Sequence, residues 1–159
     1  MRLILASTSP RRREIMALLG IPFEVIAPDF EERVCPDRSA DDEVLQFASG
    51  KAKSIAGQYP DAIVIGADTM ILLDEIIRFG KPADLDDAKR ILSTLSGNAH
   101  KILTSVAIAD RSGGPGLQHL EKVLVKMRPF SAREIDEYLQ HDESLDKAGA
   151  YSIQGTAVD

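Results

Sequence analysis

Short apolar runs alternate with stretches of helical periodicity along the chain, and this alternation restricts the fold more than any other feature. Residues 3–5 and 62–65 are apolar runs that read as buried strands, and residues 102–108 read as another strand. Residues 23–27 and 123–127 read as further strands, and 70–73 either continues 62–65 or pairs with it. Strands that alternate with amphipathic helices predict an α/β fold.

The first helix is predicted from its capping residues. Pro10 suits the first helical position, and Ser9 before it is a preferred N-cap. Ile15, Leu18 and Leu19 form an apolar stripe, and the glycine at position 20 is expected to end the helix.

Three later helices carry similar start signals. Ser39 with Asp42, and Ser131 with Glu134, have the spacing of a capping box, and Asp84 is placed to cap a third helix. The expected buried stripes are Val44, Phe47, Ala48 and Ile55 for one helix and Ala88, Ile91, Leu92 and Leu95 for another, while Phe130 and Ile135 have the spacing of a hydrophobic staple.

Composition and charge narrow the class of function. The 159 residues fit one domain or two small lobes that share a core, and no apolar run approaches the ~20 residues of a membrane-spanning helix. The net charge of −6 disfavours nucleic acid as a partner, because backbone binding needs a broad basic face. The single cysteine, Cys35, favours a reducing cytoplasm. We expect a shortened chain, because the sequence stops inside what reads as a strand.

The strongest local signal is the segment 7–13, which follows the first predicted strand. It brings Ser7, Arg11 and Arg12 to the start of a helix, where backbone N–H groups and the helix dipole favour phosphate. Arginine adds planar, bidentate contacts to phosphate oxygens. The alternative is a capped helix with solvated arginines. The clustering of basic residues here, on an acidic chain, indicates a small anionic ligand.

Three carboxylates stand in positions that suit a metal or a general base. Asp68 is predicted to follow a buried strand, where α/β proteins place ligand-binding side chains. It can coordinate a hard metal ion or accept a proton from water, or it can simply bond its own turn. Glu31 and Glu32 lie in a polar loop after a strand and can offer one metal ligand between them.

Two lysines and one amide are further candidates. Lys51 falls on the apolar face of its helix, where an ammonium group either snorkels to solvent or points at an anion. Lys81 lies in a stiff Gly-Lys-Pro turn, where it either points at an anion as well or is simply exposed. Gln154 lies in a small-residue segment that either approaches a base closely or forms a tight core turn. The three histidines, His100, His119 and His141, have no metal-ligand spacing and receive no role.

Seven segments in the same order resemble the Maf family of septum-formation-inhibitor-like proteins, over essentially the whole chain. They are STSPRR at 7–12, EE at 31–32, GKAK at 50–53, IGADT at 65–69, GKP at 80–82, SGNAH at 96–100 and DKAGAYSIQG at 146–155. The resemblance implies a mixed α/β fold with flanking helices and two lobes around a cleft, similar to that of inosine triphosphatases. It also implies a single Maf-like domain over 1–159 and a possible homodimer.

The resemblance further implies metal-dependent hydrolysis of a nucleoside triphosphate between its α- and β-phosphates, with Mg²⁺ or Mn²⁺. Within the family, the GADT and AYSIQG segments resemble the branch that acts on dTTP and UTP. The alternative is a non-catalytic nucleotide-binding regulator of septum formation. The roles implied are proton acceptor for Asp68, metal binding for Asp68 and Glu32, phosphate binding for Ser7, Arg12, Lys51 and Lys81, and nucleotide choice for Arg11, Thr69 and Gln154.

Overall fold

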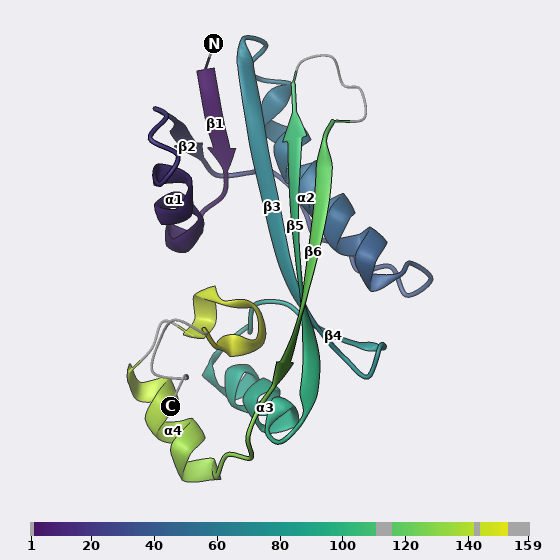
Figure 1. Ribbon diagram of the computed structural model, residues 1–159, viewed down its shortest axis with the longest axis vertical. Helices are drawn as coiled ribbons and strands as arrows, with labels where there is room; N and C mark the ends of the chain where they lie inside the picture. Colours follow the sequence, from purple (N-terminus) through teal and green to yellow (C-terminus); the bar gives the residue numbers. More distant parts are fainter. Residues whose placement is uncertain (1, 111–115, 142–143, 153–159) are drawn as a thin grey trace. The chain divides into compact units, whose positions relative to one another are not determined.

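The computed structural model describes residues 2–110, 116–141 and 144–152. The chain divides into two compact units (Figure 1). Unit 1 is formed by Met1–Asp68 and Thr104–Glu121, and unit 2 by Thr69–Leu103 and Lys122–Asp159. Because the chain crosses between them at three points, each unit is built from segments distant in sequence.

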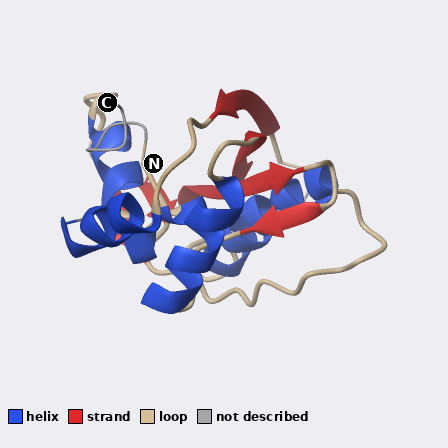
Figure 2. Cartoon of the chain, turned by 90° about the horizontal axis from the view of Figure 1, so that it is seen from below, coloured by secondary structure: helices blue, strands red, loops and turns tan. Residues whose placement is uncertain are grey.

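The chain contains both helices and strands (Figure 2), and they alternate along most of its length, which confirms the α/β class. The elements are β1 (Arg2–Ala6), α1 (Pro10–Ala17), β2 (Glu24–Ile26), α2 (Ala40–Ala56), β3 (Ala62–Leu73), β4 (Ile77–Phe79), α3 (Leu85–Leu95), β5 (Ala99–Ala109), β6 (Gln118–Lys126), α4 (Ala132–His141) and the short 3₁₀ helices η1 (Ser144–Asp146) and η2 (Ala148–Ala150).

The described strands form one six-stranded mixed sheet in the order β2-β1-β3-β5-β6, with β4 paired to β3. β1 runs parallel to both β2 and β3, with Ala6 opposite Ile26 on one side and Gly66 on the other. β4 is antiparallel to β3. The order 2-1-3 means that the chain leaves β1 for one side of the sheet and returns on the other. In such sheets ligands bind at the carboxyl ends of the strands where the order reverses.

α1 has the predicted start but not the predicted buried face. Ser9 caps it by accepting the Arg12 N–H at 3.4 Å, and Pro10 is its first residue. The stripe expected to be buried is instead exposed, with Leu18 85 % accessible, because Met16 is the residue that α1 turns into the core. The helix ends at Ala17, and Gly20 follows with a φ of 65°.

α2 and α3 form as predicted, because their caps and apolar stripes agree. Ser39 accepts the Asp42 N–H at 3.1 Å, and Asp84 accepts the Asp87 N–H at 2.8 Å. Each cap satisfies a backbone donor that the first helical turn leaves without a partner. All eight residues of the two predicted stripes are buried: Val44, Phe47, Ala48, Ile55, Ala88, Ile91, Leu92 and Leu95.

β3 differs from the sequence prediction in a way that matters for the site. Residues 62–65 and 70–73 belong to one continuous strand of 12 residues. The prediction that Asp68 follows a strand is therefore wrong, since Asp68 lies inside β3. The small pair Gly66-Ala67 reads as a turn in sequence, but neighbouring strands and α2 supply the contacts that keep it extended. The hairpin to β4, which turns at Asp74 and Glu75 with φ of 52° and 61°, has no Gly signal and was not predicted.

Each unit has its own apolar core. The core of unit 1 lies between α2 and strands β1 and β3 and contains Ile4, Ala6, Ala52, Ile55, Ala56, Ala62, Val64 and Ala109. The core of unit 2 is built mainly from β3, α3, α4 and η2 and contains Ile71, Leu73, Phe79, Ala88, Ile91, Leu92, Leu95, Ile135, Ala150 and Tyr151. Val44 is also held by a polar contact, because the buried Ser105 hydroxyl donates to its carbonyl at 2.6 Å.

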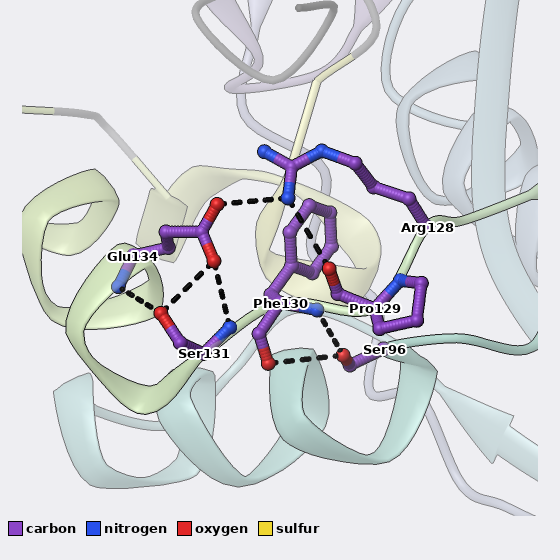
Figure 3. Close-up of polar contacts among 6 residues, drawn as sticks. All are labelled: Ser96, Arg128, Pro129, Phe130, Ser131 and Glu134. Carbon is purple, nitrogen blue, oxygen red and sulfur yellow. Dashed lines mark hydrogen bonds and ion pairs between the residues drawn. The ribbon is translucent and has the colours of Figure 1, made fainter.

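The start of α4 in unit 2 is a complete capping box (Figure 3). Glu134 accepts the Ser131 N–H at 2.8 Å, while the Ser131 hydroxyl accepts the Glu134 N–H at 3.2 Å. Arg128 donates to the same carboxylate at 2.8 Å. Phe130 and Ile135, the predicted staple, both belong to the unit 2 core. These hydrogen bonds lower the pKa of Glu134 to about 2, and the bond from the Ser131 N–H has the largest effect.

In the part of the chain that the structure describes, none of the helices combines the length and the apolar composition needed to cross a bilayer.

Glu134→Gln should lower the stability of the chain at neutral pH, because it removes the charge that the capping box and Arg128 stabilise. The folded pKa is about 2 against an ordinary 4.5, so this stability is complete above 4.5 and is lost as the pH falls toward 2. Urea denaturation between pH 7 and pH 2 should show the difference from the unsubstituted chain shrinking over that window. Glu137→Gln, which loses only an exposed pair with Arg133, is the matched control, and an equal effect there would contradict the assignment.

Candidate active site

Lys51 of α2 lies between two carboxylates in unit 1. Its Nζ is 2.5 Å from an oxygen of Asp68 and 2.5 Å from an oxygen of Glu32. The side chains of Lys51 and Asp68 are 11 % and 8 % exposed, whereas that of Glu32 is 49 % exposed. The structure thus decides between the two outcomes left open for Lys51: its ammonium group points at carboxylates rather than snorkelling.

The close approach of α2 to β3 allows this contact. A Cβ on Gly66 would lie 2.3 Å from the carbonyl oxygen of Ala48 and 2.7 Å from the nitrogen of Ala52. Only glycine therefore lets the helix backbone pack directly on the strand at this point. Lys51 stands between those two helix residues, and Asp68 is two residues beyond Gly66 on the strand.

A second glycine positions Glu32. The Phe30 ring covers Gly50, where a Cβ would lie 2.1 Å from the ring, and it contacts Phe47 edge-to-face with centroids 6.0 Å apart. Phe30 thereby fixes its loop on α2 two residues before Glu32. The neighbouring Glu31 takes a different partner, the exposed Arg33, at 2.7 Å. The structure therefore separates the acidic pair into one site residue and one surface residue.

The start of α1 faces the same group of charges. Ser7 directly follows β1, is 3 % exposed, and accepts the Ser9 N–H at 3.1 Å through its hydroxyl. Arg12, in the first turn of α1, is half-buried, and the charges of both Asp68 and Glu32 act on it. A helix N-terminus, a guanidinium and an ammonium group thus converge near the carboxyl end of β1, where the strand order reverses.

Burial and the neighbouring charges have opposite effects on the pKa values of Asp68 and Arg12. Burial raises the pKa of Asp68 above its ordinary value, and the adjacent Lys51 ammonium opposes this rise. Burial also lowers the pKa of Arg12, and the negative charges of Asp68 and Glu32 oppose that change. The four side chains carry two positive and two negative charges. The group is therefore neutral as it stands, and a raised pKa makes Asp68 a better proton acceptor than a solvated aspartate.

Not every predicted site residue joins this cluster. Arg11 is exposed and pairs with Glu14 at 3.0 Å. Thr69 and Lys81 belong to unit 2, where Thr69 is half-buried in β3 and Lys81 is exposed in the turn before α3. Gln154 lies outside the described residues. A surface depression near the C-terminal end of α1 contains none of the predicted residues and is lined by Arg13, Ala17, Gly20, Ile21, Pro22, Phe23 and Val25.

Sequence reasoning missed three residues that build the site: Phe30, Gly50 and Gly66. Gly50 and Gly66 stand inside a helix and a strand, where a glycine often marks a close backbone approach. That signal was present in the sequence. The partner of each close approach is distant in the chain, so the signal alone does not identify the contact.

Comparison with known proteins identifies the family of this chain. The chain matches the family model described as "Maf-like protein" over residues 2–159. It belongs to the Maf family. One relative of this Maf-family chain, from Symbiobacterium thermophilum, is 42 % identical over 99 % of this chain and 79 % of its own length. Another, from Hahella chejuensis, is 44 % identical over 98 % of this chain and 78 % of its own length. Both are named dTTP/UTP pyrophosphatase, as is a relative from Alkaliphilus oremlandii at 41 % identity, with 98 % and 81 % covered.

Two solved structures support the fold expected for a Maf-family chain. The Staphylococcus aureus Ham1 protein aligns with a TM-score of 0.55 at 15 % identity, covering 99 % of this chain and 92 % of that one. A nucleoside-triphosphatase / dITP/XTP pyrophosphatase from Mycobacterium abscessus aligns with a TM-score of 0.51 at 16 % identity, covering 79 % and 74 %. At these identities the likeness shows the fold alone, and it confirms the expected inosine-triphosphatase-like architecture.

Gly66→Ala should destabilise this Maf-family chain by about 1–3 kcal/mol, the usual cost of forcing an extra methyl group into a packed site. The added Cβ meets helix backbone, which cannot move aside alone, so Lys51 should also be displaced from Asp68. Gly57→Ala, at the C-terminal cap of α2, is the matched control. Its φ of −63° suits alanine, so it should be neutral or stabilising by about 0.4–1 kcal/mol. Urea denaturation of both variants tests this, and equal stabilities would contradict the close packing.

Proposed function

We propose that this chain is a nucleoside triphosphate pyrophosphatase that hydrolyses dTTP or UTP to the monophosphate and pyrophosphate. The observation that carries the proposal is the charge cluster of Lys51, Asp68, Glu32 and Arg12 at the carboxyl end of β1. Its position at the strand-order reversal is where α/β proteins bind ligands. The curated relatives in the Maf family, named for this reaction, give the substrate class.

We propose that the phosphate chain lies against the start of α1. Backbone N–H groups there, with the Ser7 hydroxyl beside them, offer hydrogen bonds to phosphate oxygens. Arg12 and Lys51 add positive charge from unit 1. On the family resemblance, Lys81 would bind phosphate as well.

The donor set fits a divalent metal that binds together with the nucleotide. Glu32 and Asp68 already share one cation, the Lys51 ammonium group. In the described residues no group of three or more His, Cys, Asp or Glu side chains gathers to form a complete cage. Mg²⁺ and Mn²⁺ suit such a site, since Mg²⁺ usually takes one or two carboxylates and completes its shell with water and phosphate oxygens. When bound, the ion would neutralise phosphate charge and polarise the α-phosphate.

In the reaction we propose, a water oxygen attacks the α-phosphorus, and the bond from that phosphorus to the bridging oxygen breaks. Asp68 accepts the proton of the attacking water, a role that its raised pKa favours. Pyrophosphate leaves with its charge met by Arg12, Lys51 and Lys81. Asp68 as base and Asp68 as metal ligand are alternative roles, and Glu32 holds the metal in either case.

The finer properties of this enzyme are proposals that rest on the Maf resemblance. Arg11, Thr69 and Gln154 would set the choice of nucleotide. The protein would work in the cytoplasm as a homodimer, without nucleic acid or membrane partners. A non-catalytic regulator of septum formation using the same pocket is the rival function, and it predicts nucleotide binding without release of pyrophosphate.

Asp68→Asn should reduce pyrophosphate release from dTTP by at least about 100-fold, because a general base contributes about 10²–10⁴-fold to a rate. The assay measures pyrophosphate and monophosphate from a panel of nucleoside triphosphates with Mg²⁺ or Mn²⁺. Asp61→Asn is the matched control, since Asp61 immediately precedes the same strand but its side chain is 65 % exposed. Binding of dTTP with no pyrophosphate from the unsubstituted chain would favour the regulator instead.

A further inference from the structure

A buried histidine in unit 2 makes a specific contact that the proposed chemistry does not use. His100 is 2 % exposed, and its Nε2 lies 2.6 Å from the Tyr151 hydroxyl, with the two rings edge-to-face and centroids 5.6 Å apart. Its Nδ1 is buried and has no hydrogen-bond partner among the described residues. Such a nitrogen costs stability. An apolar side chain would avoid this cost, so packing alone does not account for a histidine at this position.

Tyr151 closes a turn whose backbone is strained. Gly149 and Ala150 have φ of 73° and 63°, and the Ala150 N–H donates to the carbonyl of Lys147 at 3.1 Å. A positive φ at alanine costs free energy, so the surrounding contacts must hold the turn in place. Tyr151, 7 % exposed and bonded to His100, is the large side chain that anchors it.

The 148–151 turn also holds the segment that carries Lys81. The Gly149 N–H donates to the carbonyl of Gly80 at 3.0 Å, one residue before Lys81. A Cβ on Gly149 would lie 2.6 Å from Cγ1 of Ile71, so the turn also packs directly on β3 two residues beyond Thr69. The turn therefore contacts both segments of unit 2 that carry predicted nucleotide-binding residues.

We propose that His100 is a positioning residue for Lys81: through Tyr151 it holds the 148–151 turn, which fixes the segment that carries Lys81. The role of Lys81 in this inference rests on the proposed function. His100 acts through Tyr151 and the turn, so its loss weakens phosphate binding by Lys81 and leaves the proton transfer at Asp68 intact. The SGNAH and AGAY segments, which are some fifty residues apart in sequence, thus act together to position Lys81.

The variants separate positioning from simple packing. His100→Leu and Tyr151→Phe each remove one partner of the hydrogen bond, and the double variant removes both polar groups, which leaves the core apolar and folded. His100→Gln keeps an amide near the position of Nε2 and should restore part of the effect. Tyr138→Phe, which removes a hydroxyl from α4 in the same core, is the matched control.

Two measurements test the proposal: dTTP affinity by calorimetry in EDTA, and kcat and KM for pyrophosphate release with Mg²⁺. We expect the double variant to bind dTTP about tenfold more weakly and to lower kcat/KM by at least as much, because the displaced Lys81 would meet phosphate charge both in the bound nucleotide and in the leaving pyrophosphate. A folded double variant with unchanged dTTP affinity would overturn the proposal and leave the enzyme assignment intact.

The binding measurement also keeps the two proposals distinct. If the unsubstituted chain binds dTTP but releases no pyrophosphate, the proposed function fails, and weaker binding by the double variant still supports the role of His100. If the unsubstituted chain neither binds dTTP in EDTA nor releases pyrophosphate with Mg²⁺, both proposals are overturned.

Discussion

The ion-paired position of Lys51 is the constraint on which the site depends. Burying an ammonium group and a carboxylate is costly unless each finds a partner, and removing one partner leaves an uncompensated charge. Here Lys51 meets Asp68 and Glu32, and Arg12 balances the second carboxylate. The two glycines bring the helix, the strand and the Phe30 loop close enough for these contacts. Stability and chemistry therefore rest on the same backbone packing.

The same balance explains why the site suits a polyphosphate bound with a metal. The four charges of Lys51, Arg12, Asp68 and Glu32 sum to zero, so a triphosphate entering alone adds an uncompensated negative charge. The start of α1 offsets part of it through backbone N–H groups. A divalent cation offsets more, and the two carboxylates provide the oxygen ligands that such an ion prefers.

Local signals predicted much of this structure, and long-range packing accounts for the rest. Ser9, Ser39 and Asp84 act at their own helix ends, so sequence was enough to place those helices. The apolar-face position of Lys51 was likewise readable from helical spacing. The exposure of Leu18 and the extended backbone at Asp68 depend on neighbours distant in the chain, which local patterns do not contain. The same holds for His100, whose partner Tyr151 lies 51 residues away.

The most direct test of the account is whether Lys51 and Asp68 act as one unit. The rate of pyrophosphate release from dTTP should be measured for Lys51→Met, Asp68→Asn and the double variant. Residues that form one catalytic unit are strongly non-additive, so the double variant should be about as slow as the slower single variant. Losses that multiply in the double variant, or a Lys51→Met chain as fast as the unsubstituted one, would contradict the account.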